Sequence, residues 1–189
     1  MGALSQFLRS WRSWWPPALL IAAIILYAVL DTLSAPPRLP DYAQVKQDWR
    51  PSEAWLYDRD GRLLDRIRVD YKARRLDWTQ LGEISPTMRA AVIAGEDRRF
   101  EAHKGVDWLA LGGAAFARMR GDHARGASTI SMQLAGYLSP QIAAPGARGW
   151  LDKLRQMRAA WVLEDGWSKD EILEAYLNVA PFRGEAQGI

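Results

Sequence analysis

Acidic and basic side chains gather in residues 96–107, directly after an apolar segment. Glu96 and Asp97 open this stretch. The basic residues that follow them closely are Arg98, Arg99, His103 and Lys104. We expect Glu96 to end a buried helix, and a carboxylate with apolar neighbours and nearby cations has the profile of a general acid or base. The alternative is that Glu96 and Asp97 only form ion pairs with the arginines, because ion-pair networks imitate catalytic sites.

A second polar segment lies in residues 121–134. Its glycines and Arg125 predict a loop, and Ser128 and Thr129 stand at the head of an apolar-periodic stretch that reads as a helix. The free amides of such a helix start suit a pyrophosphate or a sugar hydroxyl. Simple N-capping by these hydroxyls is the alternative.

Two further helices are predicted towards the C-terminus. In residues 153–164 the apolar spacing is helical and places Lys153, Gln156 and Ala160 on one face. The last helix begins with a capping box, in which Ser168 is the N-cap and Glu171 follows three residues later. Near the end of that helix, Tyr176 and Leu177 read as core residues, whereas Asn178 is a candidate for a site role.

The elements that must position these segments can also be predicted. A helix over residues 86–96 begins with Ser85 as N-cap and Pro86 in its first turn. Residues 108–117 are apolar almost all round, which is typical of a core helix or of a helix that lies against lipid. Residues 140–149 form a Pro/Gly/Ala loop that can frame a substrate groove.

A β-hairpin is predicted within residues 53–76. Its two short apolar strands, residues 54–57 and 63–69, flank a turn in which Gly61 is placed for a positive φ. We assign this hairpin no chemistry.

The N-terminal segment predicts a membrane anchor over residues 14–34, after a cytoplasmic stretch of residues 1–13. Its central part carries no charge, and its length is close to the ~20 residues that a bilayer requires. Trp14 and Trp15 are placed to anchor it at one interface, and the preceding arginines put the N-terminus in the cytoplasm. A cleaved signal peptide is the competing reading, but only a weak cleavage site is present. Residues 35–52 are then a linker that begins as an extended, proline-rich spacer.

Composition bounds the classes of protein. A chain of 189 residues with 49% hydrophobic content can build one core domain. The net charge of +3 favours anionic membrane or phosphate-bearing partners. No basic block interleaved with aromatic residues is present, so we expect no nucleic-acid partner. The absence of cysteine excludes thiol and zinc-thiolate chemistry but does not decide the compartment.

The polar segments resemble signatures of a known family, the peptidoglycan glycosyltransferases of family 51. The first signature, E-D-x-x-F-x-x-H-x-G-x-D, is matched by Glu96, Asp97, Phe100, His103, Gly105 and Asp107. The second, G-x-S-T-I-x-x-Q, is matched by Gly126, Ser128, Thr129, Ile130 and Gln133. Met132 replaces a glutamine that is common in the family, a change typical of the penicillin-binding protein 1C branch.

The third and fourth signatures are matched with departures. In the third, Lys153, Ala160, Leu163 and Glu164 match, but Asp152 replaces an arginine and Gln156 replaces a glutamate. In the fourth, the matches are Lys169, Ile172, Leu173, Tyr176, Leu177, Asn178, Phe182, Gly188 and Ile189. Arg183 interrupts it where the family usually has a glycine. The family's domain continues past this signature, and a transpeptidase domain commonly follows, so we expect a fragment or a truncated gene product.

The resemblance implies a mainly α, lysozyme-like glycosyltransferase domain over residues 77–189, behind one transmembrane helix and the small β-hairpin. It implies polymerisation of lipid II into β-1,4 glycan strands with inversion at the donor's anomeric carbon, and Glu96 as the general base. The residues that it implies bind substrate are Asp97, Phe100, His103, Arg125, Ser128, Thr129, Gln133, Lys153, Arg155, Gln156 and Asn178. Among these, Arg125, Lys153 and Arg155 are the candidates to neutralise the pyrophosphate.

The resemblance also implies a cofactor, partners and a location. A divalent cation, Mg²⁺ or Mn²⁺, is expected, but Gln156 cannot bind a cation as a glutamate does, and no residue is assigned as a metal ligand. The expected partners are lipid II, the growing glycan strand, the membrane and other cell-wall synthesis proteins. The expected location is the bacterial cytoplasmic membrane, with the domain on its outer, periplasmic side.

Two other functions remain open. A lytic transglycosylase or muramidase shares the helical lysozyme-like architecture and a catalytic glutamate, but cleaves glycan. A catalytically inactive membrane-tethered scaffold that binds glycan or cell-wall proteins is the other, favoured by Gln156 and by the early end of the chain.

Overall fold

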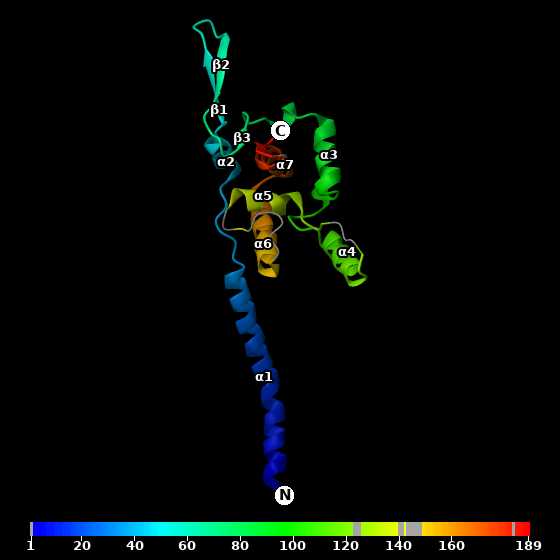
Figure 1. Ribbon diagram of the computed structural model, residues 1–189. Coiled ribbons are helices and arrows are strands. Elements are labelled where there is room, and N and C mark those ends of the chain that lie inside the picture. Colours follow the sequence, from blue (N-terminus) through cyan, green and yellow to red (C-terminus); the bar gives the residue numbers. More distant parts are fainter. Residues whose placement is uncertain (1, 123–125, 140–141, 143–148, 183) are drawn as a thin grey trace. The chain divides into compact units, whose positions relative to one another are not determined.

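The computed structural model describes residues 2–122, 126–139, 142, 149–182 and 184–189. The chain divides into two compact units, Met1–Ala35 and Pro36–Ile189, which are described separately (Figure 1). The first unit is the helix α1, Gly2–Leu33. Its segment Trp15–Leu33 has 19 residues and a mean hydropathy of 2.0, so among the described helices it is the one long and apolar enough to cross a membrane.

The second unit is mainly helical, which confirms the predicted fold class. Its elements are α2 (Tyr42–Asp48), β1 (Glu53–Tyr57), β2 (Leu63–Arg68), β3 (Arg74–Arg75), the 3₁₀ turn η1 (Leu81–Glu83), α3 (Pro86–Glu96), the 3₁₀ turn η2 (Phe100–Ala102), α4 (Trp108–Met119), α5 (Ile130–Leu138), α6 (Trp150–Gly166), α7 (Lys169–Val179) and β4 (Ala186–Gln187).

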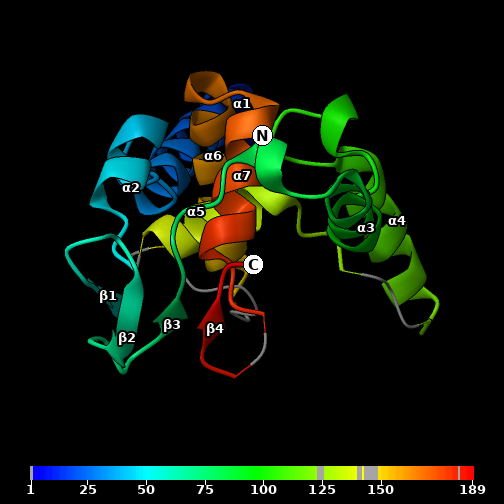
Figure 2. The same ribbon diagram turned by 90° about the horizontal axis from the view of Figure 1, so that it is seen from above.

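The core of this unit forms where α5 packs against both α6 and α7 (Figure 2). Each of the three helices contributes a leucine that is almost fully buried: Leu134, Leu163 and Leu177. Phe100 from η2 is fully buried in the same cluster. The segments that carry the predicted site residues therefore meet at one core.

The predicted helix starts are confirmed. Ser85 caps α3 and accepts a hydrogen bond from the amide of Met88 at 3.1 Å. Thr129 caps α5 in the same way. At α7, Ser168 and Glu171 form the predicted capping box. Local side-chain chemistry sets these ends, which is why sequence alone could place them.

The predicted hairpin is also confirmed. Strands β1 and β2 pair antiparallel, and Gly61 in the turn has a φ of +78°. A second, parallel pair between β3 and β4 was not predicted. It joins residues more than a hundred positions apart, and two-residue strands leave no periodic pattern.

Two expectations about burial change. The prediction that Glu96 ends a buried helix is wrong, because α3 contains no buried residue and Glu96 is exposed. The apolar residues Val92 and Ile93 of α3 are only half-buried against the core. Helix α4 likewise contains no buried residue, so of the two readings of this apolar segment the core helix is excluded.

The linker contains a helix, α2, that the sequence did not predict. It is held against α7 by Glu174, a buried carboxylate that accepts hydrogen bonds from the Tyr42 hydroxyl and from Lys46 Nζ, the latter at 3.1 Å. The indole of Trp78 donates to the same carboxylate at 2.6 Å, and the amide of Leu81 at 2.7 Å. Burial alone raises the pKa of Glu174, but these donors outweigh it and lower that pKa.

Candidate active site

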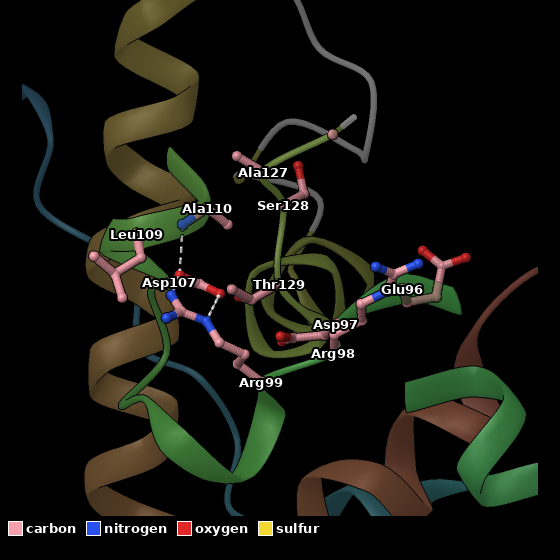
Figure 3. Close-up of a pocket in the computed structure, with 11 residues that line it drawn as sticks. Glu96, Asp97, Arg98, Arg99, Asp107, Leu109, Ala110, Ala127, Ser128 and Thr129 are labelled. Atoms are coloured by element: carbon pink, nitrogen blue, oxygen red, sulfur yellow. Dashed lines mark hydrogen bonds and ion pairs between the residues drawn. The ribbon is translucent and has the colours of Figure 1, made fainter. Parts of the chain in front are cut away.

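A cavity of about 350 Å³ lies between the end of α3, the start of α4 and the loop before α5. It is lined by Glu96, Asp97, Arg98, Arg99, Asp107, Leu109, Ala110, Gly126, Ala127, Ser128 and Thr129. Figure 3 shows Glu96 and Arg98 together at one end of this set and the pair Arg99–Asp107 at the other. The first and second polar segments of the sequence therefore build one site.

Glu96 lines the edge of this cavity and is exposed. Its Oε2 accepts a hydrogen bond of 3.0 Å from Gln133 Nε2 on α5. Gln133 Oε1 in turn accepts one of 3.1 Å from the hydroxyl of Tyr176 on α7. The carboxylate is thus oriented by a relay of two side chains that starts in the core, since Tyr176 is only 5% exposed.

The tyrosines beside Glu96 are held in their neutral form. Burial, and then the negative charge of Glu96, raise the pKa of Tyr176. The same two causes raise the pKa of Tyr137, whose ring lies 6.2 Å from that of Tyr176. Tyr137 was not predicted. It stands four residues after Gln133 on α5, a spacing that places both on one helix face and could have revealed it.

Asp97 links the first and second segments. Its buried carboxylate lies 2.9 and 3.0 Å from Nε2 of His103, and it accepts a hydrogen bond of 3.1 Å from the amide of Ile130 at the start of α5. Because Gln133 is on the first turn of that helix, Asp97 also fixes the residue that contacts Glu96.

Asp107 holds the opposite wall. It accepts hydrogen bonds from Arg99, with Nε at 2.8 Å, and it caps α4 through the amide of Ala110 at 2.7 Å (Figure 3). Its buried charge is therefore paired on both sides.

At Gly105 the loop before α4 approaches both Thr129 and the backbone of α6 closely. The Thr129 hydroxyl donates to the carbonyl of Gly105 at 2.5 Å. Gly105 has a φ of +73°, and a Cβ there would lie 2.8 Å from the backbone carbonyl of Ala160 on α6. A glycine is needed at this position for both reasons.

Lys153 brings a cation to the cavity. Its Nζ donates to Ser128 Oγ at 2.6 Å, and burial lowers the pKa of Lys153. The ammonium group of Lys153 on α6 therefore lies beside the start of α5, at one wall of the cavity.

Several other predicted site residues that the structure describes do not line this cavity. Phe100 is a core residue, and the ammonium of Lys169 lies 4.4 Å from its ring centre. Gln156 is buried in α6, where the family signature has a glutamate, and Arg155 bonds to Asp152 at 3.4 Å. Arg125 lies outside the described residues, as does most of the predicted loop of residues 140–149.

Asn178 serves the fold. It is 2% exposed, and its amide nitrogen donates to the carbonyls of Thr79 and Glu174 at 2.9 and 2.8 Å. Its Oδ1 accepts from the amide of Thr79 at 2.8 Å. Since both amide hydrogens are used by the backbone, neither is available to a substrate.

Comparison with known proteins decides the family. Residues 60–189 match the family described as Transglycosylase. The chain belongs to this family, glycosyltransferase family 51. The match begins within the hairpin turn and includes the Glu96 cavity and all four predicted signatures.

Named relatives agree with the family. A biosynthetic peptidoglycan transglycosylase of Mannheimia succiniciproducens is 36% identical over 139 residues, which are 74% of this chain and 55% of the relative. One of Pasteurella multocida is 44% identical over 59% of this chain and 44% of the relative. Penicillin-binding protein 1A of Escherichia coli is 36% identical over 81% of this chain and 17% of the relative.

The chain therefore spans about half the length of the biosynthetic transglycosylases it matches. These relatives do not assign it to the penicillin-binding protein 1C branch, which stays a prediction.

Proposed function

We propose that this chain carries the polymerising site of a peptidoglycan glycosyltransferase that joins lipid II units into β-1,4 glycan. The observation that carries the proposal is the exposed carboxylate of Glu96, oriented by Gln133 at the edge of the cavity. An exposed carboxylate with one protein donor can accept a proton from a substrate hydroxyl, whereas Asp97 and Asp107 are buried and each is held by several groups of the protein.

The proposed reaction is a single displacement. Glu96 removes the proton from the 4-hydroxyl of the acceptor sugar as that oxygen attacks C1 of the donor. The new C1–O bond forms as the bond from C1 to the pyrophosphate oxygen breaks, and the leaving group departs with that electron pair. Because attack and departure are on opposite faces of C1, the configuration inverts.

Cationic side chains are proposed to neutralise the leaving pyrophosphate. Lys153 reaches the cavity at Ser128, and Arg98 lines it beside Glu96. Arg99 is less suited, because Asp107 already occupies its guanidinium. Arg125, which the resemblance places in the adjoining loop, and Arg155 stay predictions.

The expected divalent cation can be compared with the residues near the cavity. Among the described residues, the group close enough to hold one is Asp97, His103 and Asp107. Apart from His103 Nδ1, their ligand atoms are used by one another, by Arg99 and by the amides of Ile130 and Ala110. This group therefore fits a cation poorly, and the predicted Mg²⁺ or Mn²⁺ has no step in the proposed reaction.

The apolar N-terminal helix supports a proposal for the location. We propose that Trp15–Leu33 holds the chain in the bacterial cytoplasmic membrane, with the second unit on the outer side where lipid-linked sugars are consumed. The exposed apolar residues of α4 support contact between this unit and lipid.

A glycan-cleaving function is the second candidate, and its chemistry can be compared with the cavity. Most glycosidases use two carboxylates, one of them a general acid. Asp97 and Asp107 are the other carboxylates of the cavity, and both are buried and hydrogen-bonded as acceptors. This favours a transferase that needs one base over a hydrolase that needs an acid and a second carboxylate. A lytic transglycosylase also uses one glutamate, and the product assay separates it from the transferase.

The products test the proposal. The full chain in detergent is incubated separately with radiolabelled lipid II and with finished peptidoglycan. We expect polymer from lipid II that lysozyme digests, and no release from finished peptidoglycan. Soluble muropeptides from finished peptidoglycan would instead establish the cleaving enzyme, and lipid II that binds without turnover would establish the scaffold.

A further inference from the structure

A second cavity, of about 470 Å³, lies between η2, the start of α4 and α6. It is lined by Arg99, Ala102, His103, Lys104, Val106, Trp108, Leu109 and Trp161. Arg99 and Leu109 line both this cavity and the one at Glu96. None of the proposed chemistry uses the second cavity.

Its walls are aromatic and aliphatic, and open to solvent. The rings of Trp108 and Trp161 lie 6.0 Å apart, and these residues are 57% and 39% exposed. Leu109 is 74% exposed. The apolar surface continues along α4 to Phe116, at 54%, and Met119, at 85%. Tryptophan beside exposed aliphatic side chains is typical of the interface between a membrane's headgroups and its acyl chains.

The polar groups of the cavity favour an anion. Lys104 has no ion-pair partner among the described residues, whereas Arg99 is paired with Asp107. The indole N–H groups of Trp108 and Trp161 donate no hydrogen bond to a described residue. Three donors, one of them cationic, therefore remain for a bound molecule.

His103 adds an unsatisfied polar atom. Its side chain is 8% exposed, and Nε2 is held by Asp97. Its Nδ1 is buried and has no hydrogen-bond partner in the described part of the chain. Buried polar atoms are rarely left unpaired, so this nitrogen is a feature of a lining residue that the fold does not account for.

We propose that this second cavity binds the phosphate headgroup of an anionic phospholipid. The phosphate accepts hydrogen bonds from Lys104 and the two indoles, and the acyl chains extend along Leu109, Phe116 and Met119. One unpaired lysine holds free phosphate only weakly, so the apolar face of α4 is needed for affinity. A zwitterionic choline headgroup would bring a second cation beside Lys104, so phosphatidylglycerol is preferred over phosphatidylcholine.

This site goes beyond the proposed reaction and does not depend on it. The chain contains no cysteine, so Ala102→Cys creates a single labelling position at the exposed edge of the cavity. The full chain, labelled there with an environment-sensitive fluorophore, is reconstituted into phosphatidylcholine nanodiscs with an increasing fraction of phosphatidylglycerol. We expect the emission to shift to the blue and to saturate.

Two substitutions in the labelled chain test the assignment. Lys104→Gln is expected to lower the apparent affinity for phosphatidylglycerol about fivefold, the usual contribution of one basic side chain at an anionic surface. Trp161→Phe keeps a ring but removes a donor, and should also weaken the response. Lys72→Gln is the matched control, because it removes the same charge from an exposed lysine that does not line the cavity. Circular dichroism verifies that each variant keeps its helix content.

The proposal is overturned by equal responses to the two phospholipids, or by equal effects of Lys104→Gln and Lys72→Gln. A response to lipid II in pure phosphatidylcholine, without one to phosphatidylglycerol, would assign the cavity to the substrate and also overturn it. Polymerisation is measured on the same nanodiscs. Polymer without a phosphatidylglycerol response refutes only this inference, and the reverse result refutes only the proposed function.

Discussion

Tyr176→Phe tests whether the hydroxyl of a core tyrosine sets the geometry of Glu96. The substitution keeps the ring, which packs in the core beside Tyr137, and removes the hydroxyl that donates to Gln133 Oε1 at 3.1 Å. Without that donor, nothing in the relay prevents the Gln133 amide from rotating and presenting its oxygen to the carboxylate. The hydrogen bond of 3.0 Å that orients Glu96 is then lost for much of the time.

The size of the effect follows from these contacts. Removing one partner of a mostly buried hydrogen bond costs about 1 to 2 kcal/mol. If that energy is used to hold Glu96 in its productive orientation, kcat falls about tenfold. KM for lipid II stays unchanged, because Tyr176 does not line the cavity.

The assay is the initial rate of polymerisation by the full chain over a range of lipid II concentrations. A double-mutant cycle with Gln133→Ala gives the sharper test, since Tyr176→Phe should have little further effect once the amide is gone. Equal effects of Tyr176→Phe in both backgrounds, or a change in KM alone, would refute the relay.

Three predictions concern stability of the second unit, measured as its unfolding midpoint in detergent. Glu174→Ala should lower the unfolding free energy by about 3 kcal/mol, because it leaves buried donors unpaired; an unchanged midpoint would mean that α2 is not held by this carboxylate. Gly105→Ala should cost about 3 kcal/mol, through its positive φ and the 2.8 Å approach to Ala160, and a loss below 1 kcal/mol would contradict that packing. Tyr137→Phe should make the unfolding free energy fall less steeply above about pH 10. In the folded parent the pKa of Tyr137 is raised, so above this pH the unfolded chain ionises at Tyr137 while the folded chain does not, and stability is lost. Parallel pH curves for variant and parent would contradict the last prediction.

The parts of the fold that could be predicted are those governed by neighbours in sequence. The caps Ser85, Thr129 and Ser168 and the turn glycine Gly61 act within a few residues, and each lies where expected. The parallel pairing of β3 with β4 depends on contacts between distant segments, which no local pattern records.

The same distinction separates the predicted site residues. Glu96, Asp97, Ser128 and Thr129 line one cavity, as the family resemblance implied. Asn178 was placed among them by its signature, but its amide bonds to the backbone of Thr79, which only the tertiary structure brings near.

Burial was the least predictable property of the site. The apolar run before Glu96 suggested a buried helix, yet α3 and α4 lie at the edge of the unit with no buried residue. An apolar helix face is stabilised by leaving water, and in a membrane-associated protein it can do so against lipid as well as against the protein core.

Glu96→Gln tests the central claim most directly, with Glu101→Gln, an exposed glutamate outside the Glu96 cavity, as the matched control. Polymerisation of lipid II and binding of lipid II are both measured for the full chain. We predict that Glu96→Gln lowers kcat by at least about a hundredfold, the usual contribution of a general base, while lipid II binding and the activity of the control stay at the parent level. Polymerisation by Glu96→Gln near the parent rate would contradict the claim that this carboxylate accepts the proton.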